Sequence, residues 1–415
     1  MPRRRISCTL LGTGTSSSIP LVTCVTDPHT GCHCCRSTLD PADTAGQKNK
    51  RRNTSAILRV HSEHHGERDR TILIDCGKTF LSGALEHWPK QGLREIDAVL
   101  LTHAHADAIL GLDDLRGWTL RGAIQPSIPI YCTQDTFKEV SRAFPYLTNT
   151  GAATGGGDIP SLTWHIFDSS QPFELEGLTV VPLPVHHGKF FTSPPAPYPC
   201  LGFLFDSQLA FISDVSHVPD ECWDILSRHI SLRPLRKEVQ NGHAAKWERK
   251  ESEAKPRLKA LVIDCLRIEP FTSHFGIGQA VHAAQRVGAE RTYLIGFGHR
   301  TSHTLWHSLS LTLSLPPSSL PPLPPNLSID PDIPIPVPEN LWENYGGHPD
   351  PTKEDERVFV QRGRWAVESW LANRRLYGEE VVRQEEGMWV RPSRDGMCIE
   401  LGGQGEGVRD DEYDS

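Results

Sequence analysis

Two histidines and an aspartate follow one short apolar run closely enough to bind a single cation. The run ends at Leu101, and His103-Ala104-His105-Ala106-Asp107 begins two residues later. Imidazole nitrogens and a carboxylate are typical ligands of borderline divalent cations such as zinc. With 20 histidines in 415 residues, chance pairs such as His64-His65 are expected in loops. The strand before His103 and the carboxylate of Asp107 distinguish this motif, which predicts a metal-dependent active site.

Later strand-like segments also end in side chains that can bind metal. One leads into His186 and His187, either of which can be a ligand while the other lies beside the site or is exposed. Another ends just before Asp214, whose two oxygens can bridge two cations. A third ends at His299. These segments supply the ligands that the first motif lacks.

Two further residues are assigned supporting roles. Asp75 closes a strand next to a glycine turn, and we expect it behind the metal ligands, although aspartates at turns also serve as caps. His274 lies between a strand and a helix. We predict that it protonates the leaving group, and a capping or surface histidine is the alternative.

A second metal site is predicted near the N-terminus. Cys24, Cys32 and Cys35 lie within twelve residues, and the last two have the C-x-x-C spacing of zinc ligands. Cys34 is interpreted as a bystander. Inert cysteines are the alternative to this structural zinc site, which needs a fourth ligand from elsewhere in the chain.

The elements that position these residues alternate between strands and helices, with strands predominating. We expect one hydrolase domain over residues 1–312 with a charged surface insertion at about 231–257. A proline-rich, disordered linker is expected at 313–340 because proline supports neither helices nor strand ladders. Residues 341–402 are expected to pack back on the core, and the acidic tail 403–415 is expected to be disordered.

Composition limits the partners. The formal net charge of −8 argues against a general nucleic-acid coat, which requires clustered Lys and Arg. No apolar run approaches the roughly 20 residues of a membrane helix, so no membrane partner is expected. Eleven cysteines without a secretory signal favour reduced thiols, hence an intracellular, cytoplasmic location with the nucleus left open. A homodimer is compatible with these properties.

With these motifs in view, the chain resembles the phosphodiesterase branch of the metallo-β-lactamase superfamily, which includes the phosphonate-pathway cyclic phosphodiesterases and, more distantly, tRNA 3′-processing endonucleases. The resemblance rests on the order of the motifs from Ile6 to about Leu309. It implies an αββα four-layer sandwich, in which two mixed β-sheets pack face to face with helices outside. It also implies a metal site at one edge of the sandwich.

The resemblance implies specific roles for the residues. The ligands of a first Zn²⁺ would be His103, His105 and His187, with His187 preferred over His186 because a glycine follows it. The bridging carboxylate would be Asp214, and a second metal would be held by Asp107 and His299, with Asp107 also counted as catalytic. The cysteine site matches a zinc knuckle of that branch, with His303 as its fourth ligand.

One departure from the family pattern changes the expected metal content. The pattern is His-x-His-x-Asp-His, and Ala108 stands where the final histidine belongs. A second active-site metal would lose a nitrogen ligand, so it would bind more weakly or would be a harder ion such as Mn²⁺. An enzyme with one active-site metal is the alternative.

The chemistry expected of this site is hydrolysis. A zinc ion on three neutral imidazoles lowers the pKa of its bound water toward about 7 and so supplies hydroxide at neutral pH. A small cyclic phosphodiester or nucleotide-type substrate is favoured, with RNA cleavage as the alternative and Arg52 and Arg300 as candidate phosphate contacts. Thioester or lactam hydrolysis and a non-catalytic, metal-stabilised scaffold are the other readings.

Overall fold

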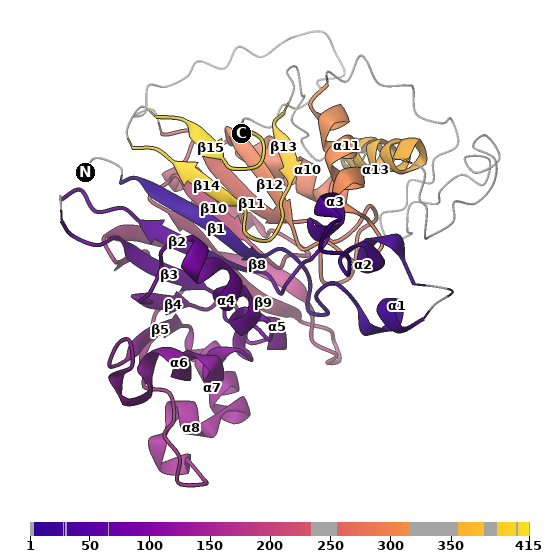
Figure 1. Cartoon of the computed structure of the whole chain (residues 1–415). Helices are drawn as coiled ribbons and strands as arrows, with labels where there is room; N and C mark the ends of the chain where they lie inside the picture. The colour runs from indigo at the N-terminus through magenta and orange to yellow at the C-terminus, as the bar shows by residue number, and fades with distance from the viewer. Residues whose placement is uncertain are drawn as a thin grey trace.

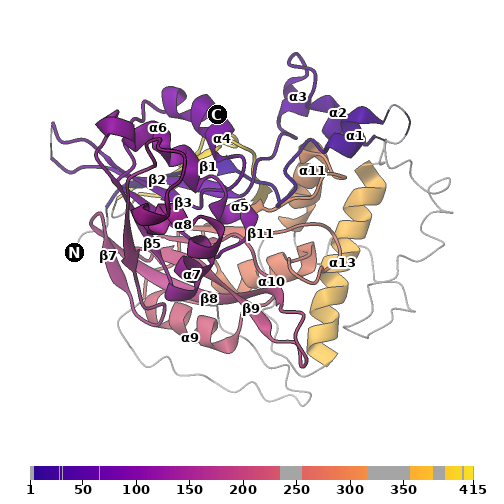
Figure 2. The same cartoon turned by 90° about the horizontal axis from the view of Figure 1, so that it is seen from below.

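A computed structural model describes residues 4–27, 29, 31–64, 66–233, 255–315, 356–376, 388–403 and 406–414. Within these residues, two β-sheets lie face to face and helices cover both outer faces (Figures 1 and 2). The predicted αββα sandwich is therefore confirmed. Residues 316–340 of the expected linker and most of the insertion at 231–257 lie outside the described residues, whereas Leu313 ends a helix. None of the described helices is apolar over a length that would cross a membrane.

The first sheet has eight strands in the described part of the chain, and it is antiparallel at one end and parallel at the other. Its strands, in spatial order, are β15 (Val408–Asp410), β14 (Cys398–Leu401), β1 (Ile6–Gly12), β2 (Ser55–Val60), β3 (Arg70–Ile74), β4 (Ala98–Leu100), β5 (Ile128–Cys132) and β6 (Leu162–Ile166).

The second sheet has seven described strands and the same mixed character, because antiparallel hairpins lead into parallel strands. In spatial order they are β13 (Val390–Pro392), β12 (Arg291–Ile295), β11 (Ala260–Asp264), β10 (Leu209–Ile212), β9 (Pro197–Phe205), β8 (Leu178–Lys189) and β7 (Phe173–Leu175).

Helices form three groups around the sandwich (Figures 1 and 2). The first sheet is covered by α4 (Phe80–Lys90), α5 (Ala106–Ile109), α6 (Arg116–Thr119), α7 (Gln134–Ala143) and α8 (Pro145–Thr148), with 3₁₀ turns at Leu112–Leu115, Leu120–Gly122 and Thr150–Ala152. The second sheet is covered by α9 (Asp220–His229), α10 (Ile277–Val287), α11 (His303–Leu313) and α13 (Glu356–Leu376). Beside α11 lie α1 (Val22–Thr26), α2 (His33–Ser37) and α3 (Thr44–Gln47).

The hydrophobic core follows these layers. Apolar side chains of both sheets, such as Leu58 and Phe203, are fully buried between them. A second cluster joins the first sheet to its helices and includes Ala108. A third joins the second sheet to α9, α10, α11 and α13. Burial of these apolar faces is the main favourable contribution to folding.

The C-terminal segment completes both sheets, because β13 pairs with β12 and β14 pairs with β1. The expectation that the whole acidic tail is disordered is wrong for residues 406–414. Here β15 pairs with β14, and Arg291 forms ion pairs with Asp410 and Asp414, both at 2.6 Å. Arg291 of the core pairs with these carboxylates, and this pairing could not be inferred from the net charge of the tail alone.

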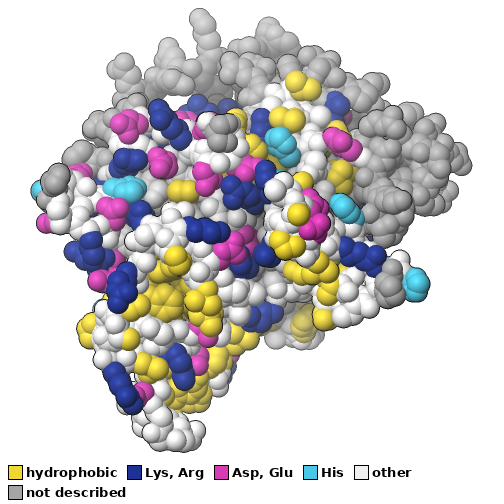
Figure 3. Space-filling view, in the orientation of Figure 1, with side chains coloured by type: hydrophobic (Ala, Val, Ile, Leu, Met, Phe, Trp, Pro, Cys, Tyr) yellow, Lys and Arg dark blue, Asp and Glu magenta, His cyan; other side chains and the backbone are white. Residues whose placement is uncertain are grey.

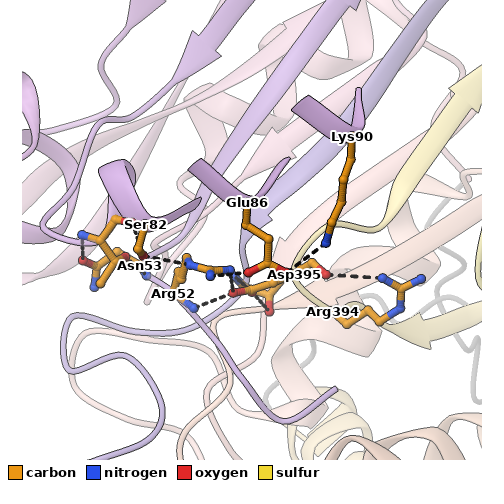
Figure 4. A network of polar contacts seen from close by, with 9 residues as sticks. Arg52, Asn53, Ser82, Glu86, Lys90, Arg394 and Asp395 are labelled. Carbon is orange, nitrogen blue, oxygen red and sulfur yellow. Dashed lines mark hydrogen bonds and ion pairs between the residues drawn. The ribbon is translucent and has the colours of Figure 1, made fainter. Parts of the chain in front are cut away.

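Arg52, predicted as a phosphate contact, instead holds the C-terminal segment to α4 (Figure 4). Its guanidinium contacts Glu86 at 2.5 Å and Asp395 at 3.4 Å, and it donates to Ser82 at 2.9 Å. The carboxylate of Asp395 also accepts from the backbone N–H of Arg52 and of Thr13. This partly exposed network is structural. Arg300, the other candidate, is exposed in the loop after β12.

Candidate active site

The ends of several strands converge on three imidazoles, the imidazole cluster His103, His105 and His187. The first two follow β4, and the third lies near the end of β8. One nitrogen from each ring lies within 4.8 Å of the others. The ring centroids are 4.7 to 5.1 Å apart. The structure therefore brings together the three residues predicted for the first metal.

A buried hydrogen-bond chain fixes the orientation of His103. The hydroxyl of Thr102 donates to Asp75 at 2.7 Å, and it lies 2.8 Å from Nδ1 of His103. A hydroxyl has one proton, so Nδ1–H of His103 must be the donor to Thr102. The lone pair of His103 is then on Nε2, which is buried and has no hydrogen-bond partner. An unpartnered buried nitrogen facing two other imidazoles fits a metal ion.

His187 has the same tautomer for a different reason. Its Nδ1 lies 2.7 Å from the backbone carbonyl oxygen of Ser273, which can only accept a hydrogen bond. Nε2 of His187 is therefore the nitrogen available to a metal. Burial lowers the pKa of His103 to about 3 and that of His105 to about 4. These imidazoles are neutral at pH 7, so protons do not compete with a metal for them.

Carboxylates and a fourth histidine surround this cluster. Asp214, after β10, groups with His187 and His274 so that one ligand atom of each lies within 4.8 Å of the others. Burial opposes ionisation of Asp214, but the imidazoles of His103, His187 and His274 outweigh it and lower its pKa to about 2. Asp214 is thus an anion at the centre of the site.

His274 is held from behind by Asp264. Its Nδ1 lies 2.9 Å from a carboxylate oxygen of Asp264, a residue that is fully buried at the end of β11. Burial lowers the pKa of His274, but the charge and hydrogen bond of Asp264 outweigh this effect and raise it to about 9. Nε2 of His274 is left to face His187 and Asp214.

Three other predicted residues have clear positions. Asp75 lies behind Thr102, as expected of a residue that supports the ligands. His186 points away from the cluster because neighbouring strand residues alternate, and its ring lies 5.4 Å from that of His217. Asp107 belongs to neither group, although burial and the charge of Asp214 raise its pKa to about 6.

The structure corrects the assignments of His299 and His303. His299 groups with Cys24, Cys32 and Cys35, and its Nδ1 lies 3.4 to 3.8 Å from their sulfur atoms. We call these four residues the cysteine cluster. His303 is instead buried at the start of α11, where its backbone N–H donates to Asn49 at 2.6 Å. His299 rather than His303 reaches the cysteines because of the path of the loop after β12.

A buried arginine sets the path of that loop. Arg51 is fully buried and donates to the carbonyl oxygens of Gly298 at 2.6 Å and Thr301 at 2.9 Å, on either side of His299. Its guanidinium also lies over the ring of Phe297. These contacts hold the His299 ring against the cysteines.

The cysteine cluster has the surroundings of thiolate ligands. The backbone N–H of Leu21 donates to the sulfur of Cys35 at 3.3 Å, and that of Cys35 donates to the sulfur of Cys32 at 3.4 Å. A hydrogen bond from the Cys35 side chain lowers the pKa of Cys32. Burial raises the pKa of Cys34 to about 11, and Cys34 lies outside the cluster. Three sulfurs and one imidazole fit a structural zinc ion.

Sequence reasoning missed four residues that shape the active site. Thr102, Ser273 and Asp264 orient the histidines, and Tyr198 stacks on His105 with ring centroids 4.4 Å apart and planes 16° apart. Asp264 could have been recognised from the sequence because it is the last residue of an apolar strand, and Asp214 follows such a strand by two residues. Tyr198 stands among prolines at the start of β9 and carries no such signal.

Comparison with known proteins agrees with this geometry. The model of the beta-lactamase superfamily domain matches residues 70–297, more than half of the 415-residue chain. The chain belongs to the metallo-β-lactamase superfamily. Within this superfamily, its two groups of active-site ligand atoms and its cysteine cluster are candidate metal sites.

Individual relatives differ in how much they share. The crystal structure of a new diphosphatase from the PhnP family is 26% identical, and the match covers 72% of this chain and 89% of that chain with a TM-score of 0.50. The short form of human tRNase Z is 15% identical over 71% of this chain and 93% of that one, with a TM-score of 0.40.

A curated relative matches by sequence. The chain is 29% identical over 315 residues to a protein named octanoyltransferase from Porphyromonas gingivalis (strain ATCC BAA-308 / W83). The match covers 75% of this chain and 49% of the relative, so the chain spans about half the length of that protein.

The hydrogen-bond chain behind His103 leads to the first prediction. Thr102→Val removes the hydroxyl that fixes the His103 tautomer, and we expect zinc affinity at the imidazole cluster to fall about 10- to 100-fold. Competition for zinc with a chelating dye measures this affinity. Thr119→Val, a buried threonine on α6, is the matched control and should keep the wild-type affinity. Equal affinities in the two variants would show that Thr102 does not orient the ligand.

The position of His299 in the cysteine cluster, in place of His303, leads to the second prediction. Cys32→Ser and His299→Ala should each remove about one zinc per chain and lower the melting temperature, because structural zinc contributes directly to folding. Elemental analysis gives the zinc count. His303→Ala is the control and should keep the full count. Loss of zinc from His303→Ala but not from His299→Ala would restore the sequence-based assignment.

Proposed function

We propose that this protein is a metal-dependent hydrolase that cleaves a small phosphodiester. The observation that carries the proposal is the buried, unpartnered Nε2 of His103, which faces nitrogens of His105 and His187. Such a nitrogen is costly to bury without a partner, and a metal ion provides one. When bound there, zinc would lower the pKa of a water ligand toward about 7 and polarise a phosphoryl oxygen.

The protein residues have separate roles in this proposal. The imidazole cluster would hold the ion through one nitrogen of each ring, which leaves the charge balance to Asp214. Because Asp214 is ionised and buried beside His187 and His274, it would favour a cation at the site. Hydrolysis of a phosphodiester also requires a proton for the departing oxygen.

His274 is the residue that we propose for protonation of the leaving group. Asp264 accepts from its Nδ1, which holds the ring in place and favours its protonated form. Its second ring nitrogen, Nε2, is then the proton donor on the side of Asp214. This pairing of a histidine with a buried carboxylate keeps the proton at a defined atom.

Ala108 argues for one active-site metal rather than two. Its side chain is buried in the hydrophobic cluster between the first sheet and its helices, with Ile109 and Leu112. No ligand enters the site from this position, and Asp107 joins neither group of ligand atoms. The three imidazoles are unaffected by the alanine, so it does not favour a non-catalytic scaffold.

Among substrates, phosphoryl compounds receive the most support. The 26% identical relative is a diphosphatase, and its chain is matched over 89% of its length. The name octanoyltransferase belongs to a protein of which this chain spans about half, so it gives little support to acyl transfer. On the face shown in Figure 3, Lys and Arg alternate with Asp and Glu, which favours a small substrate over a long RNA.

Neighbouring histidines on β8 provide the third prediction. Wild-type protein should hydrolyse bis(p-nitrophenyl) phosphate, and a chelator should abolish the reaction until zinc or manganese is restored. His187→Ala should lower metal content and reduce kcat/KM by at least about 100-fold, because it removes a ligand. His186 points away from the site, so His186→Ala should change neither the metal content nor kcat/KM.

Two further outcomes make the assay decisive. His274→Ala should keep its metal but lose about 10²- to 10⁴-fold in kcat, as expected for loss of a proton donor rather than of a ligand. Turnover of nitrocefin or of a thioester by fully metal-loaded protein, with no phosphodiester turnover, would contradict the proposed function.

A further inference from the structure

The hairpin that joins β8 to β9 displays two aromatic rings that the core does not use. Phe190 is 43% exposed and Phe191 is 102% exposed. The hairpin projects from the second sheet in Figures 1 and 2. Adjacent exposed aromatic side chains are costly in water and often belong to binding sites. The exposure of these rings therefore indicates a binding site for a ligand.

The hairpin is built to hold these rings in place. The backbone N–H of Phe190 donates across it to Ala196 at 2.8 Å, and Thr192 donates through its hydroxyl to Pro194 at 2.9 Å. Four prolines, at positions 194, 195, 197 and 199, restrict the backbone further. A rigid hairpin loses little entropy when a ligand binds to it.

Ring contacts connect the hairpin directly to the imidazole cluster. Phe190 packs against Tyr198 with centroids 5.1 Å apart, and Tyr198 in turn stacks on His105 at 4.4 Å. The ring of Tyr198 is also 6.3 Å from the rings of both His103 and His187. A single ring thus separates Phe190 from the proposed metal ligands.

We propose that Phe190 forms a stacking subsite for a nucleobase carried by the substrate. This inference rests on the proposed function, since the phosphoryl group would lie at the imidazole cluster and its substituent would extend along the hairpin. The substrate class is then a nucleotide-type phosphodiester. Lys189, exposed beside Phe190, adds a cation for a second phosphate or for the ester itself.

A nucleobase fits these rings better than an aliphatic group does. Stacking of a base on an aromatic side chain contributes about 1–3 kcal/mol and tolerates different bases, because every base has a π-face. An aliphatic group gains only from burial, which any apolar side chain can provide. Phe190 offers a flat ring packed on Tyr198, so its replacement by leucine separates these two cases.

The test compares two esters with the same leaving group. Thymidine 5′-(p-nitrophenyl phosphate) carries a base, and methyl p-nitrophenyl phosphate carries none. Phe190→Leu should raise KM for the thymidine ester about 5- to 100-fold, by loss of stacking, and should raise KM for the methyl ester much less. Phe190→Trp keeps a flat ring and should behave as wild type. Ile166→Ala, an exposed apolar residue on β6, is the matched control.

Equal KM shifts for both esters, or no shift in Phe190→Leu, would overturn the nucleobase subsite while leaving the phosphodiesterase proposal intact. If wild type hydrolyses neither ester, the proposed function fails, and calorimetric titration of the zinc-loaded protein with AMP decides the subsite. Binding of AMP that Phe190→Leu weakens supports it, and absence of binding overturns it. A dinucleotide with a lower KM than the thymidine ester would identify the base as part of an RNA chain.

Discussion

The single proton of the Thr102 hydroxyl is the constraint on which the active site depends. Because that proton is donated to Asp75, the imidazole of His103 must donate from Nδ1 and present the lone pair of Nε2. The arrangement requires β3 and β4 to be neighbours in register, with the backbone N–H of Asp75 bonded to Leu100. Asp75 adopts a positive φ of 57°, an uncommon conformation that the surrounding sheet stabilises.

The same principle organises the rest of the site. Each ligand histidine whose tautomer is defined is fixed by a hydrogen-bond acceptor, the hydroxyl of the preceding residue Thr102 for His103 and the carbonyl of the distant residue Ser273 for His187. His274 depends in the same way on Asp264. Contacts behind the site therefore determine which nitrogen of His103 and of His187 faces it, and each sheet supplies one of these contacts.

The cysteine cluster shows a second use of the sandwich edge. It joins α1 and α2 to the loop after β12, and Arg51 holds that loop through two carbonyl oxygens. The N–H of Gly296 also donates to the carbonyl of Thr13, next to the first strand. The N-terminal segment is thus tied to the second sheet by a site whose chemistry is separate from that of the imidazole cluster.

Much of the fold and of the first ligand set could be predicted because ligands that follow strand ends are visible in the sequence. His103, His105, His187 and Asp214 each follow or end an apolar run, and the sheets bring these ends together. His303 rather than His299 was assigned to the cysteine cluster because the two lie four residues apart, and the path of the loop that carries His299 is set by Arg51 some 250 positions away in the chain. Tyr198 and Thr102 act through contacts that no spacing encodes.

Anomalous X-ray scattering at the zinc edge, from crystals of the zinc-loaded protein, tests most directly whether the imidazole cluster binds metal. We expect one peak between His103, His105 and His187 and another among Cys24, Cys32, Cys35 and His299. Absence of a peak between the three imidazoles, in crystals that show the cysteine peak, would show that the buried hydrogen-bond chain does not prepare a metal site.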